Sequence, residues 1–371
     1  MANKLLAKMK KEKAFLDVLS TEHKVDEWLS TNCISVNLLL SGKIQGGIKK
    51  GAISMICADS GWGKSMIGYS VLKSAYDSGM DCFIIDTENA TNYEVLTSLG
   101  VNMDDVGVFN TNRIPEVKQI LAKLGKGLTR EEARNVFVLI DSWGPLVTEQ
   151  VMEKAEEASA AADMGSTARF KNELANVLLA CGFTTLVLNH VYASLQQYGE
   201  AFAIPGGKRI FFNSDAIMLA SSAAKDKDKE GNILGKIITA SVKKGRAAKE
   251  FVKTKYLILH SGGVSPYYGL LDEAMESGEV YKPKPGYYSR TNFDVNKETG
   301  EATKMWKEDE LYCPEFWVPI YKTENFRHYV EAKFAFEDQQ LINSTQNVMD
   351  MINGKVDVPT ASDEEVAEDE E

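Results

Sequence analysis

One short stretch constrains the fold of this chain more than any other: an apolar run that leads directly into a glycine-rich turn containing a lysine. The run is AISMICA (52–58), the turn is DSGWGKS (59–65), and a helical pattern follows. Small residues let successive backbone N–H groups point at phosphate oxygens, and the N-terminus of the following helix adds positive potential. The stretch therefore predicts a strand, a phosphate-binding loop and a helix, with Ala58 where such loops usually carry their first glycine.

Further apolar runs alternate with helical stretches as far as residue 190. Each run is apolar along its whole length, which is typical of parallel strands covered on both faces. These runs are 81–86, 136–141 and 184–189. The helices expected between them are one that ends at Gly79, one that opens on the capping-box pattern Thr91–Glu94 and ends at Gly100, and one around 166–180.

The alternation changes after residue 213. The runs DAIMLAS (215–221), KIITASV (236–242) and FVKTKYLIL (251–259) follow one another, the first two joined by a charged turn at 225–232. This pattern indicates antiparallel strands added to the sheet. The sequence therefore predicts an α/β fold with a central, mostly parallel sheet and an antiparallel extension.

The two ends of the chain differ from this core. Residues 1–19 carry apolar residues near a helical period, and residues 20–34 look like a polar linker. Four of the nine prolines and two adjacent aromatic pairs fall within 278–345, which suggests a small C-terminal lobe. The expected division is a helical N-terminal arm, a core that carries the phosphate-binding loop, this lobe and an acidic disordered tail, at 1–30, 31–277, 278–345 and 346–371.

Net charge is unevenly distributed along the chain. The formal charge is −11, which as an average argues against a nucleic-acid-binding protein. However, the last sixteen residues (356–371) hold eight acids and no base, and without them the charge is −3. Basic residues cluster at 4–13, 208–209 and 243–255. The tail is either a solubility segment or a phosphate mimic that competes for a basic groove.

Several classes of protein are disfavoured by what the sequence lacks. No apolar run approaches the ~18 residues of a membrane-spanning helix, and the N-terminus has no apolar signal region. The five cysteines and four histidines are scattered. We therefore expect reduced, buried thiols in a cytosolic protein, without a zinc site and without a membrane partner.

Three residues, two in the predicted phosphate-binding loop and one at the end of a predicted strand, have the types that phosphate chemistry requires. Lys64 is placed to reach the β- and γ-phosphates, and the Ser65 hydroxyl is placed to bind Mg²⁺. Asp141 ends the run NVFVLID, and a carboxylate at the carboxyl end of a parallel strand faces the ligand crevice. We expect it to complete the metal site.

A second group of strand-end residues suits hydrolysis. Glu88 ends FIIDTE, where a carboxylate would activate water; Asp86, on the same strand face, is the competing candidate, and a helix-capping acid is the plain alternative. His190 closes LVLNH and is either a sensor of the γ-phosphate or an ordinary strand-end histidine. Further on, Gly206-Gly207 and Lys208-Arg209 suit a close approach to a phosphate backbone, or form a plain hairpin turn with solvated bases.

Six motifs in order resemble the RecA family of homologous-recombination ATPases. They are ADSGWGKS (58–65), FIIDTEN (83–89), VFVLIDSWG (136–144), LNHVY (188–192), PGGKRIFFNSDAIMLA (205–220) and SVKKGR (241–246). The similarity covers roughly residues 30–340. The glutamate after the second strand, the histidine at the sensor position and the stretch 265–288 resemble bacteriophage members of that family.

The resemblance implies a role for each matched position. Glu88 matches the catalytic acid, His190 the sensor that links ATP to DNA, and Asp141 the metal-binding acid together with Ser65. Lys244 and Arg246 match a pair that reaches the ATP of the neighbouring subunit. The nucleotide site includes Asp59, Ser60, Gly61, Trp62, Gly63, Lys64, Ser65 and Met66. The two DNA loops fall at 150–165 and 191–209, and their matched contact positions are Met164, Gly165, Arg169, Gly206, Gly207, Lys208 and Arg209.

The resemblance also implies the partners. They are ATP with Mg²⁺, single-stranded DNA, homologous duplex DNA, further copies of the chain in a helical filament, and mediator and single-strand-binding proteins, in the cytoplasm of a phage-infected bacterium. The basic stretch 243–255 would supply side chains that reach across the subunit interface, or it is only the solvent-exposed face of an edge strand. Two rival functions remain: a hexameric helicase with a RecA-type fold, and a non-catalytic ATP-sensing scaffold.

Overall fold

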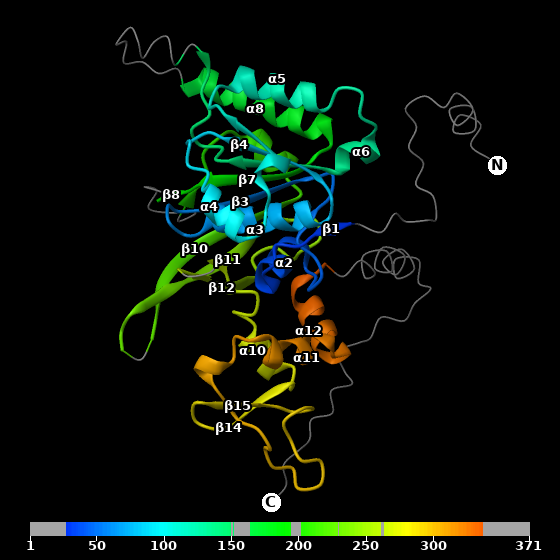
Figure 1. Cartoon of the computed structure of the whole chain (residues 1–371), viewed down its shortest axis with the longest axis vertical. Helices are drawn as coiled ribbons and strands as arrows, with labels where there is room; N and C mark the ends of the chain where they lie inside the picture. The colour runs from blue at the N-terminus through cyan, green and yellow to red at the C-terminus, as the bar shows by residue number, and fades with distance from the viewer. Residues whose placement is uncertain are drawn as a thin grey trace, which may run out of the picture.

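The computed structural model describes residues 27–149, 151, 164–193, 202–228, 230–260 and 263–336. Within these residues nine strands form one central sheet, in the order β13-β12-β11-β10-β3-β7-β6-β4-β5 (Figure 1). The strands are β3 (Ile53–Ala58), β4 (Asp81–Asp86), β5 (Val106–Asn110), β6 (Val136–Asp141), β7 (Thr184–His190), β10 (Ala216–Lys227), β11 (Ile233–Gly245), β12 (Lys253–Leu259) and β13 (Gly263–Val264). The expected α/β class with a mostly parallel sheet is confirmed.

The apolar strands bury side chains on both faces, as their sequences predict. Ile56 of β3 and Leu139 of β6 belong to the layer that packs on α3 (Lys64–Asp77). Their neighbours Cys57 and Val138 belong to the layer that packs on α5 (Ile114–Leu124) and α8 (Met164–Cys181). Figure 1 shows α5 and α8 together on one side of the sheet and α3 on the other.

The register of the parallel strands brings their carboxyl ends to one edge. Ala58 at the end of β3 pairs with His190 at the end of β7, and Asp86 pairs with Asp141. Because each of these strands ends on the same line, the residues just beyond them are neighbours in space although they are far apart in sequence. This edge is where the candidate site forms.

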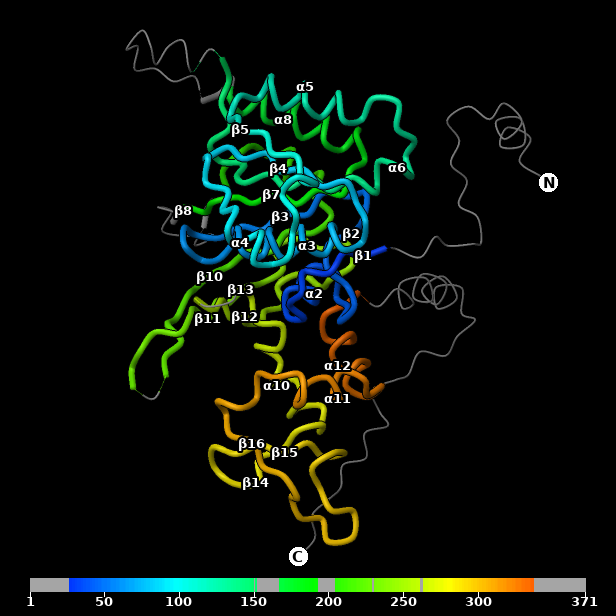
Figure 2. Tube along the Cα trace, in the orientation of Figure 1, coloured from blue at the N-terminus to red at the C-terminus, as the bar shows by residue number. Residues whose placement is uncertain are grey.

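The antiparallel extension starts at β10. Its first residues run parallel to β3, and its whole length then pairs with β11, so that the two strands form a hairpin that projects beyond the sheet (Figure 2). Asp228 closes the tip by accepting hydrogen bonds from the backbone N–H groups of Glu230 and Asn232. The predicted charged turn (225–232) is therefore shorter than expected, because β10 continues as far as Lys227.

A smaller unit follows the sheet. It contains α10 (Leu271–Glu276), β14 (Val280–Lys284), β15 (Tyr287–Arg290), β16 (Trp306–Lys307), α11 (Pro314–Lys322) and α12 (Glu324–Phe334). Its interior is organised by Arg290, which is buried and paired with Asp294 at 2.8 Å, while Trp306 donates to the same carboxylate. The domain limits expected from the sequence stay predictions.

Several local predictions are wrong or lie outside the described residues. The helix α4 (Tyr93–Ser98) is capped by Asn92 and not by Thr91, because the Thr91 hydroxyl donates to Asp86 instead. The linker expected at 20–34 gives way to a short strand, β1 (Trp28–Leu29), and Ile34 already begins a helix. The arm helix (1–19) and the acidic tail lie outside the described residues.

The remaining elements are short or peripheral. They are α2 (Ile34–Ser41), β2 (Ile48–Lys49), α6 (Arg130–Arg134), β8 (Tyr192–Ala193), β9 (Phe202–Ala203) and α9 (Lys208–Asn213). None of the helices in the described part of the chain is long and apolar enough to cross a lipid bilayer.

Candidate functional site

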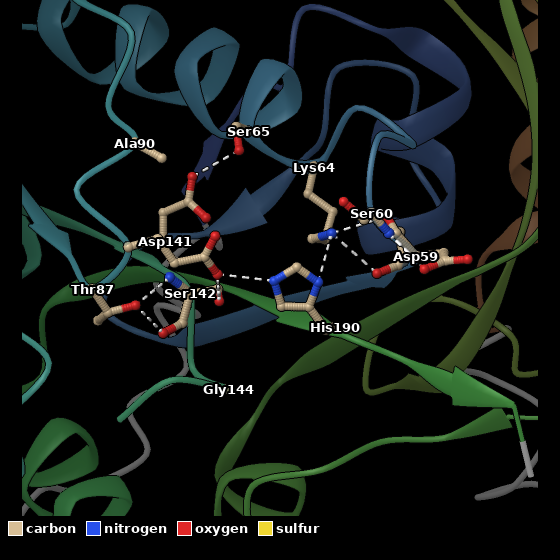
Figure 3. Close-up of polar contacts among 12 residues, drawn as sticks. Asp59, Ser60, Lys64, Ser65, Thr87, Ala90, Asp141, Ser142, Gly144 and His190 are labelled. Carbon is tan, nitrogen blue, oxygen red and sulfur yellow. Dashed lines mark hydrogen bonds and ion pairs between the residues drawn. The ribbon is translucent and has the colours of Figure 1, made fainter. Parts of the chain in front are cut away.

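The turn after β3 forms a compact loop over which a lysine folds back. Gly63 has φ 79°, and a Cβ there would lie 2.7 Å from Ile258 Cδ1, so a larger residue does not fit. Lys64 Nζ donates to the carbonyls of Ala58 (3.1 Å) and Asp59 (3.0 Å) (Figure 3). In this loop the ammonium is held against backbone oxygens, where a phosphate group offers stronger acceptors.

Lys64 is a largely desolvated cation. Only 6% of the residue is exposed, and burial lowers the pKa of its ammonium, while Asp141 and Glu88 act in the opposite direction. A buried cation gains most from an anionic ligand, since its own hydration is already lost. The position therefore suits a phosphate.

Ser65 and Asp141 meet at the start of α3. The Ser65 hydroxyl donates to Asp141 Oδ2 at 2.7 Å. Burial raises the pKa of Asp141, and the Ser65 hydrogen bond opposes that rise. One hydroxyl and one carboxylate fit Mg²⁺, which keeps several waters and takes phosphate oxygens as further ligands. Among the described residues no cluster of three or more His, Cys, Asp or Glu side chains forms a metal cage.

The two candidate acids after β4 have different surroundings. Asp86 is 3% exposed, and its carboxylate accepts hydrogen bonds from the backbone N–H groups of Glu88, Ala90 and Thr91 and from the Thr91 hydroxyl. It therefore closes the turn that follows the strand. The prediction that Glu88 ends the strand is wrong, because Glu88 lies two residues beyond the end of β4. There its Oε1 contacts Ser142 and His190 instead of closing a turn, and of the two acids it suits water activation.

His190 connects Glu88 with the phosphate lysine. Its Nε2 lies 2.9 Å from Glu88 Oε1 and its Nδ1 lies 3.4 Å from Lys64 Nζ (Figure 3). Because a lysine ammonium only donates, this arrangement fits an imidazole whose Nδ1 accepts and whose Nε2–H donates to the carboxylate. A single side chain, that of His190, therefore connects the phosphate lysine with Glu88.

Ser142 is a site residue for which the sequence analysis assigned no role. Its hydroxyl donates to Glu88 Oε1 at 2.6 Å, and its backbone N–H donates to the hydroxyl of Thr87. Burial raises the pKa of Glu88, but the hydrogen bonds from Ser142 and His190 together outweigh it, so the pKa lies below its ordinary value. The only signal in the sequence is a small polar residue directly after Asp141.

Ser142→Ala is expected to lower ATP turnover about tenfold, because a hydrogen bond to a charged group contributes about 1.5–3 kcal/mol. Losing this bond raises the pKa of Glu88, so turnover as a function of pH should begin to fall at a higher pH on the acid side. Steady-state rates between pH 4 and 8 test this. An unchanged acid limb would contradict the role of Ser142.

Lys236 is a second cation at the loop, and the sequence did not predict it. It lies on β11, and its Nζ donates to the Gly61 carbonyl at 2.8 Å. Gly61 has φ 71°, and a Cβ on it would come within 3.3 Å of that ammonium. The contact joins residues 175 positions apart, which explains why no local pattern reveals it.

Lys244 and Arg246 contact other parts of the chain than the phosphate loop. Lys244 Nζ donates to the carbonyls of Phe211, Phe212 and Ser214 at the end of α9. Arg246, with a side chain that is 63% exposed, lies 3.9 Å from Asp215. In the described residues these two basic side chains are thus separate from Lys64.

The candidate DNA positions are only partly described. Gly206 and Gly207 have φ 111° and 90°, and Arg169 exposes 80% of its side chain. Lys208 and Arg209 begin α9, so the plain hairpin turn considered for them is wrong. Met164 and Gly165 are the first residues of α8, whereas 150, 152–163 and 194–201 of the two loops lie outside the described residues.

Comparisons with known proteins find matches over most of the chain. A family model described as the RecA N-terminal domain matches residues 3–265, and one described as the C-terminal domain of the bacteriophage T4 recombination and repair protein matches 267–330. That phage T4 protein is 29% identical over 336 residues, 87% of this chain and 83% of its own. Protein RecA of Treponema denticola is 27% identical over 71% of this chain and 63% of its own length. Protein RecA of Cereibacter sphaeroides is 24% identical over 74% of this chain and 79% of its own length.

Proposed function

The chain belongs to the RecA family of recombination ATPases, and from this premise we propose that it polymerises on single-stranded DNA as an ATP-bound helical filament. In this filament it carries out homologous pairing and strand exchange with duplex DNA, in recombination and repair. The observation that carries the proposal is the chain of contacts from Lys64 through His190 to Glu88. His190 lies just before β8, the strand that leads into the second loop.

ATP hydrolysis is assigned to the edge of the sheet. Lys64 neutralises the β- and γ-phosphates, and Ser65 with Asp141 would hold Mg²⁺, which supplies further charge neutralisation. Glu88 accepts a proton from water while Ser142 and His190 hold its carboxylate in place. The loop residues from Asp59 to Met66 form the cradle.

The joint between subunits is assigned to the surface that carries Lys244 and Arg246. Lys244 and Arg246 reach the ATP of the next subunit, so that two chains share each nucleotide. Such a head-to-tail contact does not close on itself and generates an open helix. Until ATP binds, the basic side chains at this joint repel one another. Nucleotide binding therefore favours assembly.

DNA binding is assigned to the two loops that follow β6 and β7. Gly206 and Gly207 permit a close approach of the backbone, and Lys208, Arg209 and Arg169 are exposed cations for phosphates. Recognition through phosphates leaves base edges free, as a protein that accepts any sequence requires.

ATPase rates with and without single-stranded DNA, combined with electron microscopy, test the proposal. We expect hydrolysis to rise about tenfold or more with DNA, because coupling between sites is typically 5–150-fold, and we expect open filaments. Closed rings would indicate the helicase alternative. Binding of ATP without hydrolysis would indicate a sensing scaffold.

A further inference from the structure

Lys171 on α8 is a buried cation that none of the assignments above uses. The residue is 6% exposed, and burial lowers the pKa of its ammonium to about 8. Its one hydrogen bond in the described part of the chain goes to the carbonyl of Gly144, at 2.7 Å. Because a buried ammonium with a single acceptor is destabilising, this contact indicates a role other than stability.

Gly144 lies where the ATP site meets the base of the second loop. A Cβ on Gly144 would be 3.7 Å from His190 Cδ2, so this residue packs beside the imidazole that contacts Glu88. The preceding residue, Trp143, donates its indole N–H to the carbonyl of Gly206 at 2.8 Å. The turn containing residues 142–144 therefore touches His190 and also holds the loop that carries the glycine pair.

The end of β7 holds the same loop through a neighbouring residue. Asn189 donates to the carbonyl of Pro205 at 2.8 Å, whereas its buried Oδ1 accepts no hydrogen bond from the described residues. That oxygen would lie 3.9 Å from a Cβ on Gly144. With two more N–H groups on Lys171 and a free acceptor on Asn189, the junction has the hydrogen-bonding capacity for a second arrangement.

The helix α8 contacts the second loop directly, next to Lys171. Asn172 Oδ1 accepts from the backbone N–H of Arg209 at 3.0 Å, and a Cβ on Gly207 would come within 2.7 Å of that oxygen. The helix also follows residues 152–163, which belong to the first loop expected from the sequence. Adjacent side chains of one helix thus bind the second loop and the Gly144 turn.

We propose that Lys171 is a positioning residue that transmits DNA binding at the two loops to the Glu88–His190 pair. This inference rests on the proposed function, since it assumes that the loops bind DNA and that Glu88 activates water. When DNA fixes the loops and with them α8, the Lys171 hydrogen bond fixes the Gly144 carbonyl. The turn then holds the ring of His190, and through it Glu88, in the position that hydrolysis needs.

The test is the ratio of ATPase rates with and without single-stranded DNA in Lys171→Met. Methionine keeps the length and apolar stem of lysine but removes the donor. We expect the ratio to fall about tenfold relative to the wild type, a typical coupling between two sites. The matched control is Lys118→Met, because Lys118 of α5 pairs with Glu173 of α8 at 2.8 Å on another side of the same helix. This control should keep the wild-type ratio.

A second readout separates positioning from folding. Removing a buried charge that has no ion-pair partner among the described residues should leave the melting temperature of Lys171→Met unchanged or higher. If that variant does not fold, Trp143→Phe removes the indole N–H that holds Gly206 and should lower the same ratio. Full DNA stimulation in a folded Lys171→Met, or in Trp143→Phe, would overturn the inference. A wild type that ignores DNA would overturn the proposed function as well.

Discussion

Replacing Glu88 by glutamine is expected to leave ATP binding intact and to lower ATP turnover by about 10²–10⁴-fold, the range that general acid–base catalysis supplies. The glutamine amide has nearly the same size, and its oxygen still accepts a hydrogen bond from Ser142, which lies 2.6 Å from Glu88 in the wild type. It does not accept a proton from water, however. The variant therefore removes the chemical step and keeps the architecture.

Calorimetric titration with ATP and single-turnover hydrolysis measure the two halves of this prediction. The matched control is Asp86→Asn, at the end of the same strand. It weakens the hydrogen bonds that close the turn after β4, so it should lower the melting temperature while folded molecules still turn over ATP. Normal turnover in Glu88→Gln would contradict the assignment. Loss of turnover confined to folded Asp86→Asn would transfer the role to Asp86.

The strands of the core could be predicted from the sequence because both of their faces are buried. β4 and β6 match the predicted runs 81–86 and 136–141, since most of their residues are apolar and an aspartate marks the end of each; only the expectation that Glu88 ends the first of them is wrong. β5 was not predicted. Of its five residues only Val106 is buried, and a half-exposed edge strand containing Gly107 carries no continuous apolar signal.

The site could be predicted where residues lie at the ends of strands in register. Asp141 and His190 end strands in register with β4 and β3, and Lys64 follows the loop after β3; the structure brings His190 within 3.4 Å of Lys64. The contacts of Lys236 with the phosphate loop and of Lys171 with Gly144 could not be predicted, because each depends on how distant elements pack. The choice between Asp86 and Glu88 likewise depends on which carboxylate the turn uses for its own N–H groups.

Lys244 and Arg246 differ in how they are held, and this difference decides which variant tests the subunit joint. The Lys244 ammonium bonds three carbonyls at the end of α9, where the helix dipole favours a cation. Lys244→Ala therefore also loosens the helix that follows the second loop within its own subunit. Arg246 has a largely exposed side chain, so its removal costs the fold little.

Arg246→Ala is expected to lower the DNA-stimulated ATPase by about 10³-fold or more, the effect of an arginine that stabilises the transferred phosphoryl group from a neighbouring chain. ATP binding by the isolated subunit should persist, because Lys64 and Ser65 are unchanged. Steady-state rates at saturating DNA and calorimetric ATP binding measure the two effects. A dilute monomer that hydrolyses ATP at the full rate would contradict a shared site.

Mixing two inactive variants tests the shared site directly. In a filament formed from equal amounts of Arg246→Ala and Lys64→Ala, a joint is complete when the first supplies the phosphate loop and the second supplies the arginine. Random assembly along a head-to-tail interface makes about one joint in four complete, so about a quarter of the wild-type rate should return. Mixing Arg246→Ala with Lys244→Ala should restore nothing, because both lesions lie on the same side of the joint. If the first mixture also stays inactive, while electron microscopy shows that both variants enter the same filaments, Arg246 acts within its own subunit and the joint is wrongly assigned.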